Sequence, residues 1–259
     1  MSYFKISYVL SLVISFLSCE QKNYHYPKCR AIADENGILK DSFGFYFSNF
    51  EPFDSSQDKF VRDTFWQQYL SANLWAFKEP VLYNNYLGKD RYRFLWLRSF
   101  HLPVVFNIAN VNGSITLSVK KLARRPYWKD YCCIDTTSKE ISFFREKGYQ
   151  LFQRIDTLEN GVTEVVTVVK GDRQSEIIYD STKSITKKDW QNFEKLIGDA
   201  GFWSLKTYEP PFATDGSFWI IEANLKKQYK YVIRQSPAGK IRSIGEALIK
   251  LSGLKEEIY

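Results

Sequence analysis

The feature that most constrains the fold is a series of short β-type segments separated by tight turn signals. Asn112-Gly113 lies between two such segments, at 104–108 and 114–122, and an Asn-Gly pair in that position favours a β-hairpin. Other segments of the same type are 91–98, 141–144, 149–155, 163–169, 176–179, 217–223 and 229–234. Strands joined by short turns pair antiparallel, so the sequence predicts a mainly antiparallel sheet.

Three further segments have the apolar spacing that is typical of helices. The first, at about 58–77, has apolar side chains at intervals of four and three, at Trp66, Leu70, Leu74 and Phe77. The second spans about 187–199, after a capping box from Thr186 to Asp189, and the third spans about 242–252. Gly201 and Gly253 suit the positions just after the last two helices. Strands flanked by about three helices predict an α+β fold.

The first 18 residues have the composition of an export signal. Lys5 precedes an apolar run from about Ile6 to Leu17, which is shorter than a membrane-spanning helix. The residues at its end, Phe16-Leu17-Ser18-Cys19, resemble a bacterial lipobox. The resemblance implies that Cys19 is lipidated and becomes the new N-terminus, so that acyl chains anchor the protein to a membrane. Ordinary secretion and an uncleaved anchor are the alternatives.

We therefore expect three parts in the chain. Residues 1–18 are a lipoprotein signal peptide, 19–57 are a tether and ordered lead-in, and 58–259 are a single α+β domain. The expected location is the cell envelope, on the outer membrane or the periplasmic face.

The blocks that begin at Trp66 and Trp190 share an order of residues: Trp-Gln, then an aromatic residue, then a second Trp. This shared order predicts a weak internal duplication, with chance similarity as the alternative.

Cysteine usage leaves two interpretations open. An oxidising compartment allows a disulfide, and Cys29 could pair with Cys132 or Cys133. Equally, Cys132 and Cys133 could be small buried hydrophobic residues.

The chain has a formal net charge of +7, but its basic residues are scattered among acidic ones. Nucleic-acid-binding proteins gather Lys and Arg on one face or stripe, so we expect no nucleic-acid partner.

Motifs for common cofactor chemistry are missing from the sequence. It contains no GxxxxGK[ST] phosphate loop, no GxGxxG, no GxSxG elbow and no HExxH helix. With two His in all, a site with several His ligands is impossible within one chain. We therefore predict no cofactor and no metal site, and the sequence leaves the oligomeric state open.

Residues 91–251 resemble a loose family of uncharacterised bacterial envelope lipoproteins. The resemblance rests on these residues: Arg93 through His101, Gly201-Phe202-Trp203, Asp215-Gly216-Ser217, Trp219, Glu222, Tyr231, Arg234 and Ser236-Pro237. It implies an envelope protein and carries no activity with it.

Arg combined with Trp is the composition of binding surfaces. The sequence thus predicts a non-catalytic binding, immunity-type or assembly-accessory module that contacts an envelope protein or polymer. The candidate contact residues are Arg98, His101, Trp219, Glu222 and Arg234. Packing of the Trp in the core, a structural His at a strand end and an ion pair on the sheet surface are the alternative roles.

The alternative function is an envelope hydrolase that acts on glycan or peptide through the carboxylate pair Asp215 and Glu222. On the predicted strand 217–223, Glu222 shares a face with Phe218 and Ile220, and Trp219 lies on the other face. Arg234 on the following strand reaches Glu222 only if the register of the hairpin permits.

Overall fold

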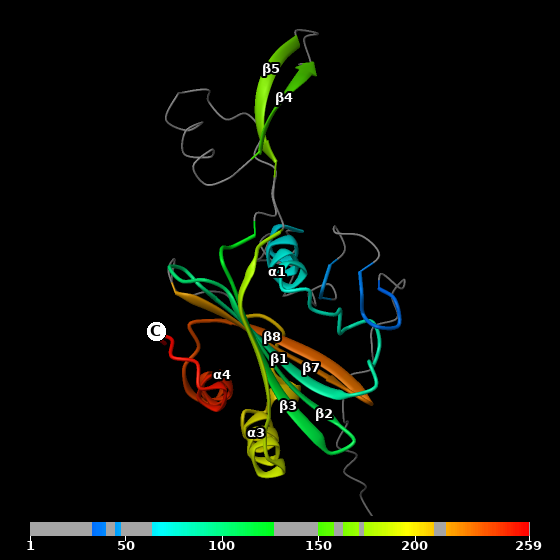
Figure 1. Cartoon of the computed structure of the whole chain (residues 1–259), viewed down its shortest axis with the longest axis vertical. Coiled ribbons are helices and arrows are strands. Elements are labelled where there is room, and N and C mark those ends of the chain that lie inside the picture. The colour runs from blue at the N-terminus through cyan, green and yellow to red at the C-terminus, as the bar shows by residue number, and fades with distance from the viewer. Residues whose placement is uncertain are drawn as a thin grey trace, which may run out of the picture.

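The computed structural model describes residues 33–39, 45–47, 64–126, 150–157, 163–170, 174–209 and 216–258. Six of its strands form one antiparallel sheet in the order β6-β3-β2-β1-β7-β8 (Figure 1). Their bounds are β1 Asp90–Arg98, β2 Val104–Val111, β3 Ser114–Leu122, β6 Ile177–Ser184, β7 Ser217–Leu225 and β8 Gln228–Gln235. The predicted α+β fold with a mainly antiparallel sheet is therefore confirmed.

The described residues also contain three α-helices and one short 3-10 helix. They are α1 Thr64–Ala76, α3 Lys187–Asp199, α4 Gly239–Ser252 and η1 Phe202–Ser204. Two more strands, β4 Gln150–Thr157 and β5 Thr163–Lys170, pair with each other in a separate two-stranded sheet. The predicted strand at 141–144 lies outside the described residues, as do Cys19, Cys29, Cys132 and Cys133.

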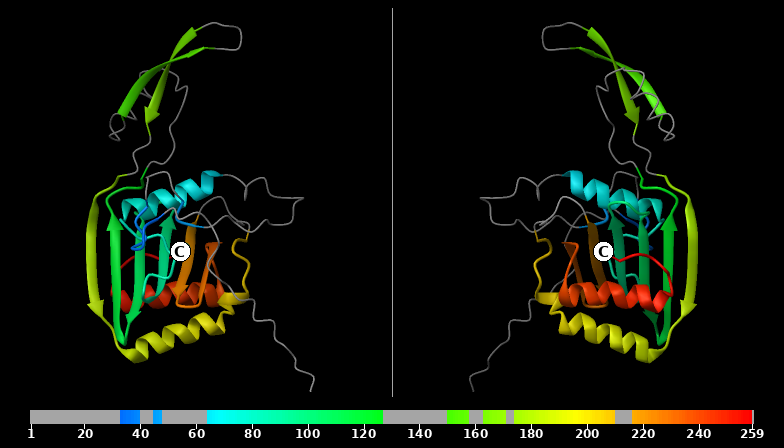
Figure 2. Two further views of the ribbon diagram at one scale, coloured as in Figure 1. Left: turned by 90° about the vertical axis from the view of Figure 1, so that its right-hand side faces the viewer. Right: turned by 90° about the vertical axis from the view of Figure 1, so that its left-hand side faces the viewer.

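Helices cover both faces of the six-stranded sheet. Helix α1 lies on one side, which we call the α1 face, and α3 and α4 lie on the other, the α3/α4 face (Figures 1 and 2). Each face has its own hydrophobic cluster. The segments 33–39 and 45–47 also contribute buried residues to the cluster on the α1 face, so this part of the lead-in belongs to the core.

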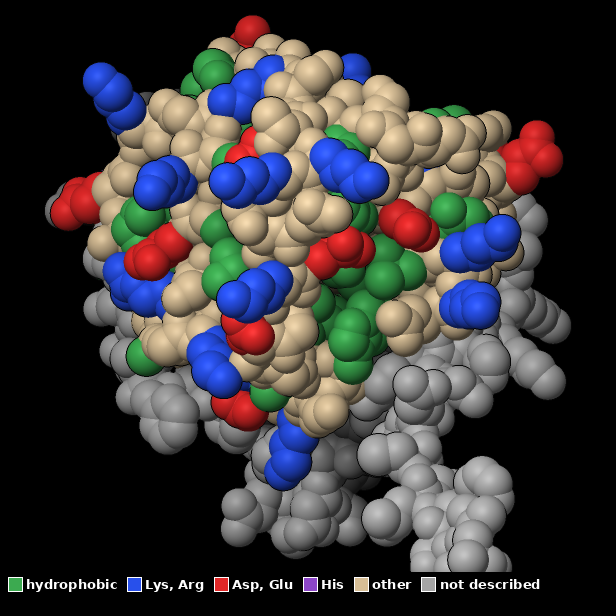
Figure 3. Space-filling model, turned by 90° about the horizontal axis from the view of Figure 1, so that it is seen from below, with side chains coloured by type: hydrophobic (Ala, Val, Ile, Leu, Met, Phe, Trp, Pro, Cys, Tyr) green, Lys and Arg blue, Asp and Glu red, His purple; other side chains and the backbone are tan. Residues whose placement is uncertain are grey.

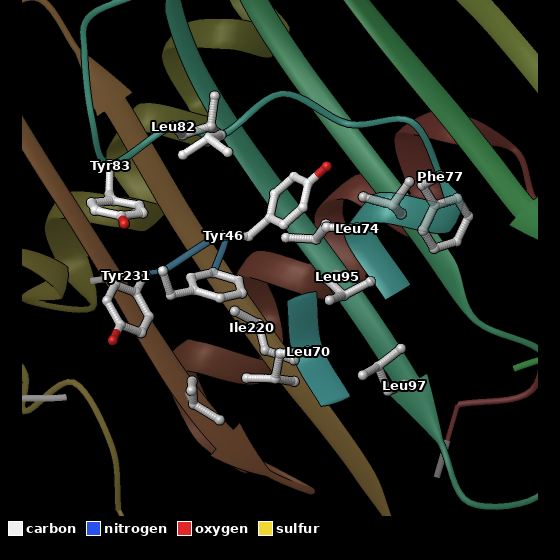
Figure 4. Packing of buried hydrophobic residues seen from close by; sticks show 14 of the residues in the cluster. Tyr46, Leu70, Leu74, Phe77, Leu82, Tyr83, Leu95, Leu97, Ile220 and Tyr231 are labelled. Carbon is white, nitrogen blue, oxygen red and sulfur yellow. The ribbon is translucent and has the colours of Figure 1, made fainter. Parts of the chain in front are cut away.

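Strand β1 lies at the centre of the sheet, and its side chains alternate between the two faces. Leu95 and Leu97 pack on the α1 face, whereas Phe94 and Trp96 pack on the α3/α4 face. Figure 4 shows Leu74 of α1 and Tyr46 of the lead-in against Leu95 and against Ile220 of β7. A strand covered on both faces buries both of its sides, which explains the continuous apolar run Phe94–Leu97 in the second half of β1.

Local sequence signals explain most element ends. Asn112 and Gly113 have φ angles of 50° and 90°, the positive values that a type I′ hairpin requires. Thr186 and Asp189 make both hydrogen bonds of the predicted capping box at the start of α3. Gly201 and Gly253, with φ of 61° and 78°, follow α3 and α4 in the left-handed conformation.

Three predicted boundaries within the described residues are wrong by three or more residues. Strand β2 continues to Val111, whereas the prediction ended at residue 108. Strand β6 continues to Ser184, whereas the prediction ended at residue 179, because its last residues are polar and exposed on the edge of the sheet. Helix α4 begins at Gly239, three residues before its predicted start. At the end of β6 the hydrogen-bonded backbone extends beyond the apolar residues that the prediction used.

Strands β3 and β6 are neighbours although more than 50 residues separate them along the chain. The backbone N–H of Ala123 donates to the carbonyl of Glu176 at 2.8 Å. The Ser175 hydroxyl donates to the carbonyl of Arg124 at 3.0 Å. The chain therefore leaves the sheet and returns to it at one closed neck.

Candidate functional site

The five residues predicted to contact a partner do not lie on one surface. Arg98 and Trp219 are on the α3/α4 face, and Glu222 is on the α1 face. Trp219 is completely buried against Trp96 and Phe94, which supports the alternative of core packing. The sequence did predict correctly that Trp219 and Glu222 occupy opposite faces of their strand.

Arg98 and His101 hold the C-terminal residues against the sheet. The Arg98 guanidinium lies 4.1 Å from the centre of the Trp96 ring and pairs with Glu256 at 2.8 Å. The His101 Nε2 atom is 3.9 Å from Glu257 Oε2. Only His101 of this group has a substantially exposed side chain.

Arg234 holds a loop and does not reach Glu222. Its Nη2 atom donates to the carbonyl of Lys206 at 2.9 Å and lies 3.0 Å from Glu209 Oε1. The register of the hairpin places Arg234 opposite Trp219 and Tyr231 opposite Glu222. The register of the hairpin therefore does not bring Arg234 to Glu222.

Glu222 instead forms a buried ion pair with Arg93, its neighbour on β1. The Nε atom of Arg93 donates to Glu222 Oε2 at 2.8 Å, and Nη2 donates to the same oxygen. The Tyr229 hydroxyl donates to the other oxygen, Oε1, at 2.7 Å. Both carboxylate oxygens thus have partners, and Glu222 is only 1% exposed.

A second carboxylate extends this arrangement toward α1. Glu79 Oε1 accepts from Lys120 Nζ at 2.8 Å, and Oε2 accepts from Asn107 Nδ2 at 3.0 Å. Arg93 connects the two carboxylates, because its Nη1 atom lies 3.8 Å from Glu79 Oε2 and donates to the carbonyl of Pro80 at 2.7 Å. We call this set the buried ionic cluster; it comprises Glu79, Arg93, Asn107, Lys120, Glu222 and Tyr229.

Burial dominates the electrostatics of the cluster. Desolvation raises the pKa of Glu222, and the charge of Arg93 and the Tyr229 hydrogen bond act in the opposite direction. Desolvation and the Glu222 carboxylate both raise the pKa of Tyr229 well above its usual value, so its hydroxyl stays a donor. A carboxylate that water does not reach and whose oxygens are both occupied is suited to holding strands together. Asp215, its proposed catalytic partner, lies outside the described residues, so the carboxylate pair stays a prediction.

A cavity of about 1020 Å³ adjoins the buried ionic cluster at Glu79. It lies between the lead-in, the end of α1 and the neck of β3 and β6. Its lining combines apolar and charged side chains, among them Leu39, Tyr46, Trp75, Lys78, Arg124 and Glu176. Lys78 stands at the rim with a positive φ of 56°, which ends α1 and turns the chain toward Glu79.

Neither the cluster nor the cavity is indicated by the sequence. Glu79 comes just after the predicted helix at 58–77, and Lys120 is one of the scattered basic residues, so neither position indicates a site. One signal was present, since Arg91 and Arg93 alternate with Tyr92 and Phe94 in a strand that continues into an apolar run, and a charge in a buried strand requires a partner. Nothing in the spacing of Glu79 and Glu222 shows that the fold brings them to one arginine.

Other observations complete the description of the site. Lys and Arg side chains are interspersed with Asp and Glu on the face seen in Figure 3. Within the described ranges, no three His, Cys, Asp or Glu side chains are grouped as metal ligands would be. In the same ranges, no helix has both the length and the apolar character to span a membrane. Comparison with known proteins found no matching family model, no matching curated protein and no matching solved structure.

Proposed function

We propose that this chain is a non-catalytic binding protein of the cell envelope, anchored by lipid at Cys19, that holds its ligand in the cavity beside α1. The cavity is the observation that carries the proposal. Ligand sites are concave and mostly apolar, with a few polar groups that fix orientation. Trp75, Tyr46 and Leu39 provide the apolar wall, and Lys78 and Glu176 provide charges of opposite sign.

The geometry of Glu222 also supports binding over hydrolysis. A general acid or base must come within hydrogen-bond reach of its substrate. Arg93 and Tyr229 already occupy the Glu222 oxygens, and the residue is closed to solvent. The hydrolase that would use Asp215 with Glu222 stays the alternative prediction.

The anchor rests on the sequence of residues 16–19, and the predicted internal duplication rests on the Trp66 and Trp190 blocks. The helices of these two blocks, α1 and α3, lie on opposite faces of one sheet. Both ideas stay predictions.

Native mass spectrometry of the full-length protein, purified in mild detergent from its own membranes, tests the proposal. We expect the mass of residues 19–259 plus acyl chains, with a small molecule or peptide bound. The variants Trp75→Ala and Lys78→Glu should lose the bound species. Phe100→Ala, which removes an aromatic ring that is 78% exposed and outside the cavity lining, should retain it.

Each contrary result has a distinct meaning. An unmodified N-terminus would refute the lipid anchor. A bound species that survives both cavity variants would refute the cavity as its site. Lipidated protein without any bound species would count against the binding role and favour the hydrolase.

A further inference from the structure

Arg91 is buried on the α1 face, one step along β1 from Arg93. Its Cα pairs with Ala109 on β2 and with Asn224 on β7, so it lies near the middle of the sheet. Only 9% of its surface is exposed. The loop before β1 covers this end of the face, since Asn224 Nδ2 donates to the carbonyls of Leu82 and Asn85 at 2.6 and 2.9 Å.

Within the part of the chain that the structure describes, the Arg91 guanidinium has no hydrogen bond and no ion pair. Its Nε atom is fully buried without a partner. The terminal nitrogens are not among the fully buried atoms, so they reach the surface that remains exposed. By contrast, Arg93, Arg98 and Arg234 each have a carboxylate and a backbone carbonyl as partners. A buried cation without a counter-charge is costly, so its retention requires an explanation.

Burial lowers the pKa of Arg91, and the charges of Glu79 and Glu222 act in the opposite direction, but neither carboxylate forms an ion pair with it. Arg93 and Tyr229 occupy Glu222, and Lys120 and Asn107 occupy Glu79. Arg91 therefore leaves the site with one positive charge in excess. Lys89 adds another, and burial and the nearby charge of Arg91 lower its pKa, whereas the more weakly acting charge of Glu79 raises it.

Two buried amide oxygens that accept no hydrogen bond lie on the strands beside Arg91, whose Nε atom donates none. The Oδ1 atom of Asn224, opposite Arg91, is buried and has no hydrogen bond, and neither has Oδ1 of Asn107, opposite Arg93. A ligand that fits must accept from a guanidinium and also donate a proton to an amide oxygen. An ionised carboxylate only accepts. A phosphate group near its second pKa, about 6 for a monoester, has both charged oxygens and a P–OH.

We propose that the terminal nitrogens of Arg91, assisted by Lys89, bind a phosphate group, either as free phosphate or as the phosphate of a small monoester. The planar guanidinium matches two phosphate oxygens at once. The P–OH donates to Asn224 or Asn107. This site is separate from the cavity lining and does not depend on the function proposed for the cavity.

Calorimetric titration of the full-length protein at pH 6 tests the site, with sodium phosphate, glycerol phosphate and sodium sulfate at matched ionic strength. We expect both phosphates to bind and sulfate, which is fully ionised and has no proton to donate, to bind at least tenfold more weakly. Tighter binding of glycerol phosphate than of inorganic phosphate would identify the monoester as the source. The reverse order would identify free phosphate.

The variant Arg91→Met removes the charge and keeps the length of the side chain. It should weaken phosphate binding at least tenfold, and in phosphate-free buffer it should melt at or above the wild-type temperature, because an unpaired buried charge is gone. Lys89→Met, at a more exposed position, should weaken binding about threefold and provides a second variant if the first does not fold. Arg242→Met, in an exposed pair on α4, should leave binding unchanged.

Four results would overturn the proposal. The first is wild-type protein that binds phosphate no better than chloride. The second is phosphate binding that survives both Arg91→Met and Lys89→Met. The third is sulfate binding as tight as phosphate binding, which would refute the assignment to phosphate. The fourth is an Arg91→Met variant whose melting temperature falls by the same amount with and without phosphate. This result would show that Arg91 has only a structural role.

Discussion

Arg93 and Glu222, which lie 129 positions apart in the chain, form an ion pair between β1 and β7, and each is only 1% exposed. Removing one partner of such a pair leaves the other charge buried and uncompensated. The pair therefore favours the observed register of β1 and β7, because a shift of either strand would move a charge into the hydrophobic core.

The single variants Arg93→Met and Glu222→Met should each lower the free energy of unfolding by about 3–5 kcal/mol. The double variant should lose less than the sum of the two, because an apolar pair of similar size needs no counter-charge. Urea denaturation of the three variants measures the coupling. Glu246→Gln, which breaks the exposed pair with Arg242 on α4, is the matched control and should cost about 0.5 kcal/mol or less. Additive losses in the double variant would contradict this account.

Two glycines within helices should respond to alanine in opposite directions. A Cβ at Gly245 of α4 would overlap the Trp219 ring and come within 2.9 Å of Phe94 Cζ, whereas a Cβ at Gly198 of α3 meets nothing within 4 Å. Gly198→Ala should raise stability by about 0.5–1 kcal/mol through helix propensity. Gly245→Ala should lower it by about 1–3 kcal/mol through overpacking. Thermal unfolding of both variants checks the signs, and a stabilising Gly245→Ala would refute the close packing of α4 on the sheet.

The contact of the C-terminal residues with Arg98 should make stability depend on acidity. Burial acts to raise the pKa of Glu256, but the hydrogen bonds and charges of Lys121 and Arg98 outweigh it and hold that pKa below its usual 4.5. A carboxyl whose pKa is lowered by folding stabilises the protein above the unfolded pKa, and this contribution is lost as the pH falls through the folded pKa. The melting temperature of Glu256→Gln should thus fall below that of the wild type at pH 7, and the difference should shrink as the pH drops below 4.5. A difference that does not change with pH would refute this explanation.

Thr186 should stabilise the start of α3 from an exposed position. Its side chain accepts from the Asp189 N–H at 3.1 Å, and the Thr186 N–H donates to the Asp189 carboxylate at 3.1 Å. Thr186→Ala should lower the free energy of unfolding by about 1 kcal/mol. Thr186→Ser, which keeps the hydroxyl, should cost far less in the same urea titration. Equal losses in the two variants would exclude the cap as the cause.

The elements that were predictable are those whose signals are local. Asn112-Gly113 determines a hairpin through its own backbone preference, and Thr186 with Asp189 determines a helix start within four residues. The faces of β7 follow from simple alternation. Each of these needs no knowledge of distant parts of the chain.

The site was not predictable, because distant segments build it. Glu79 follows α1, Lys120 lies on β3 and Glu222 lies on β7, and only the strand order brings them around Arg93. Arg98 and Arg234 were predicted to contact a partner, whereas in the structure they pair with the C-terminal residues and with the loop before β7. A sequence shows that a buried arginine needs partners and does not show which residues provide them.

The closed neck between β3 and β6 should allow the segment between these two strands to change in length and sequence. Because the strands meet at Ala123 and Glu176, the pairing of β3 with β6 fixes the distance between these two ends whatever the length of chain that connects them. The entropy of closing a loop grows only with the logarithm of its length, so replacing about 50 residues by a short turn changes the closure cost by about 2 kcal/mol. The segment between β3 and β6 should therefore tolerate insertions, deletions and replacement by another sequence. Its sequence could diverge while the sheet and its buried charges stay the same.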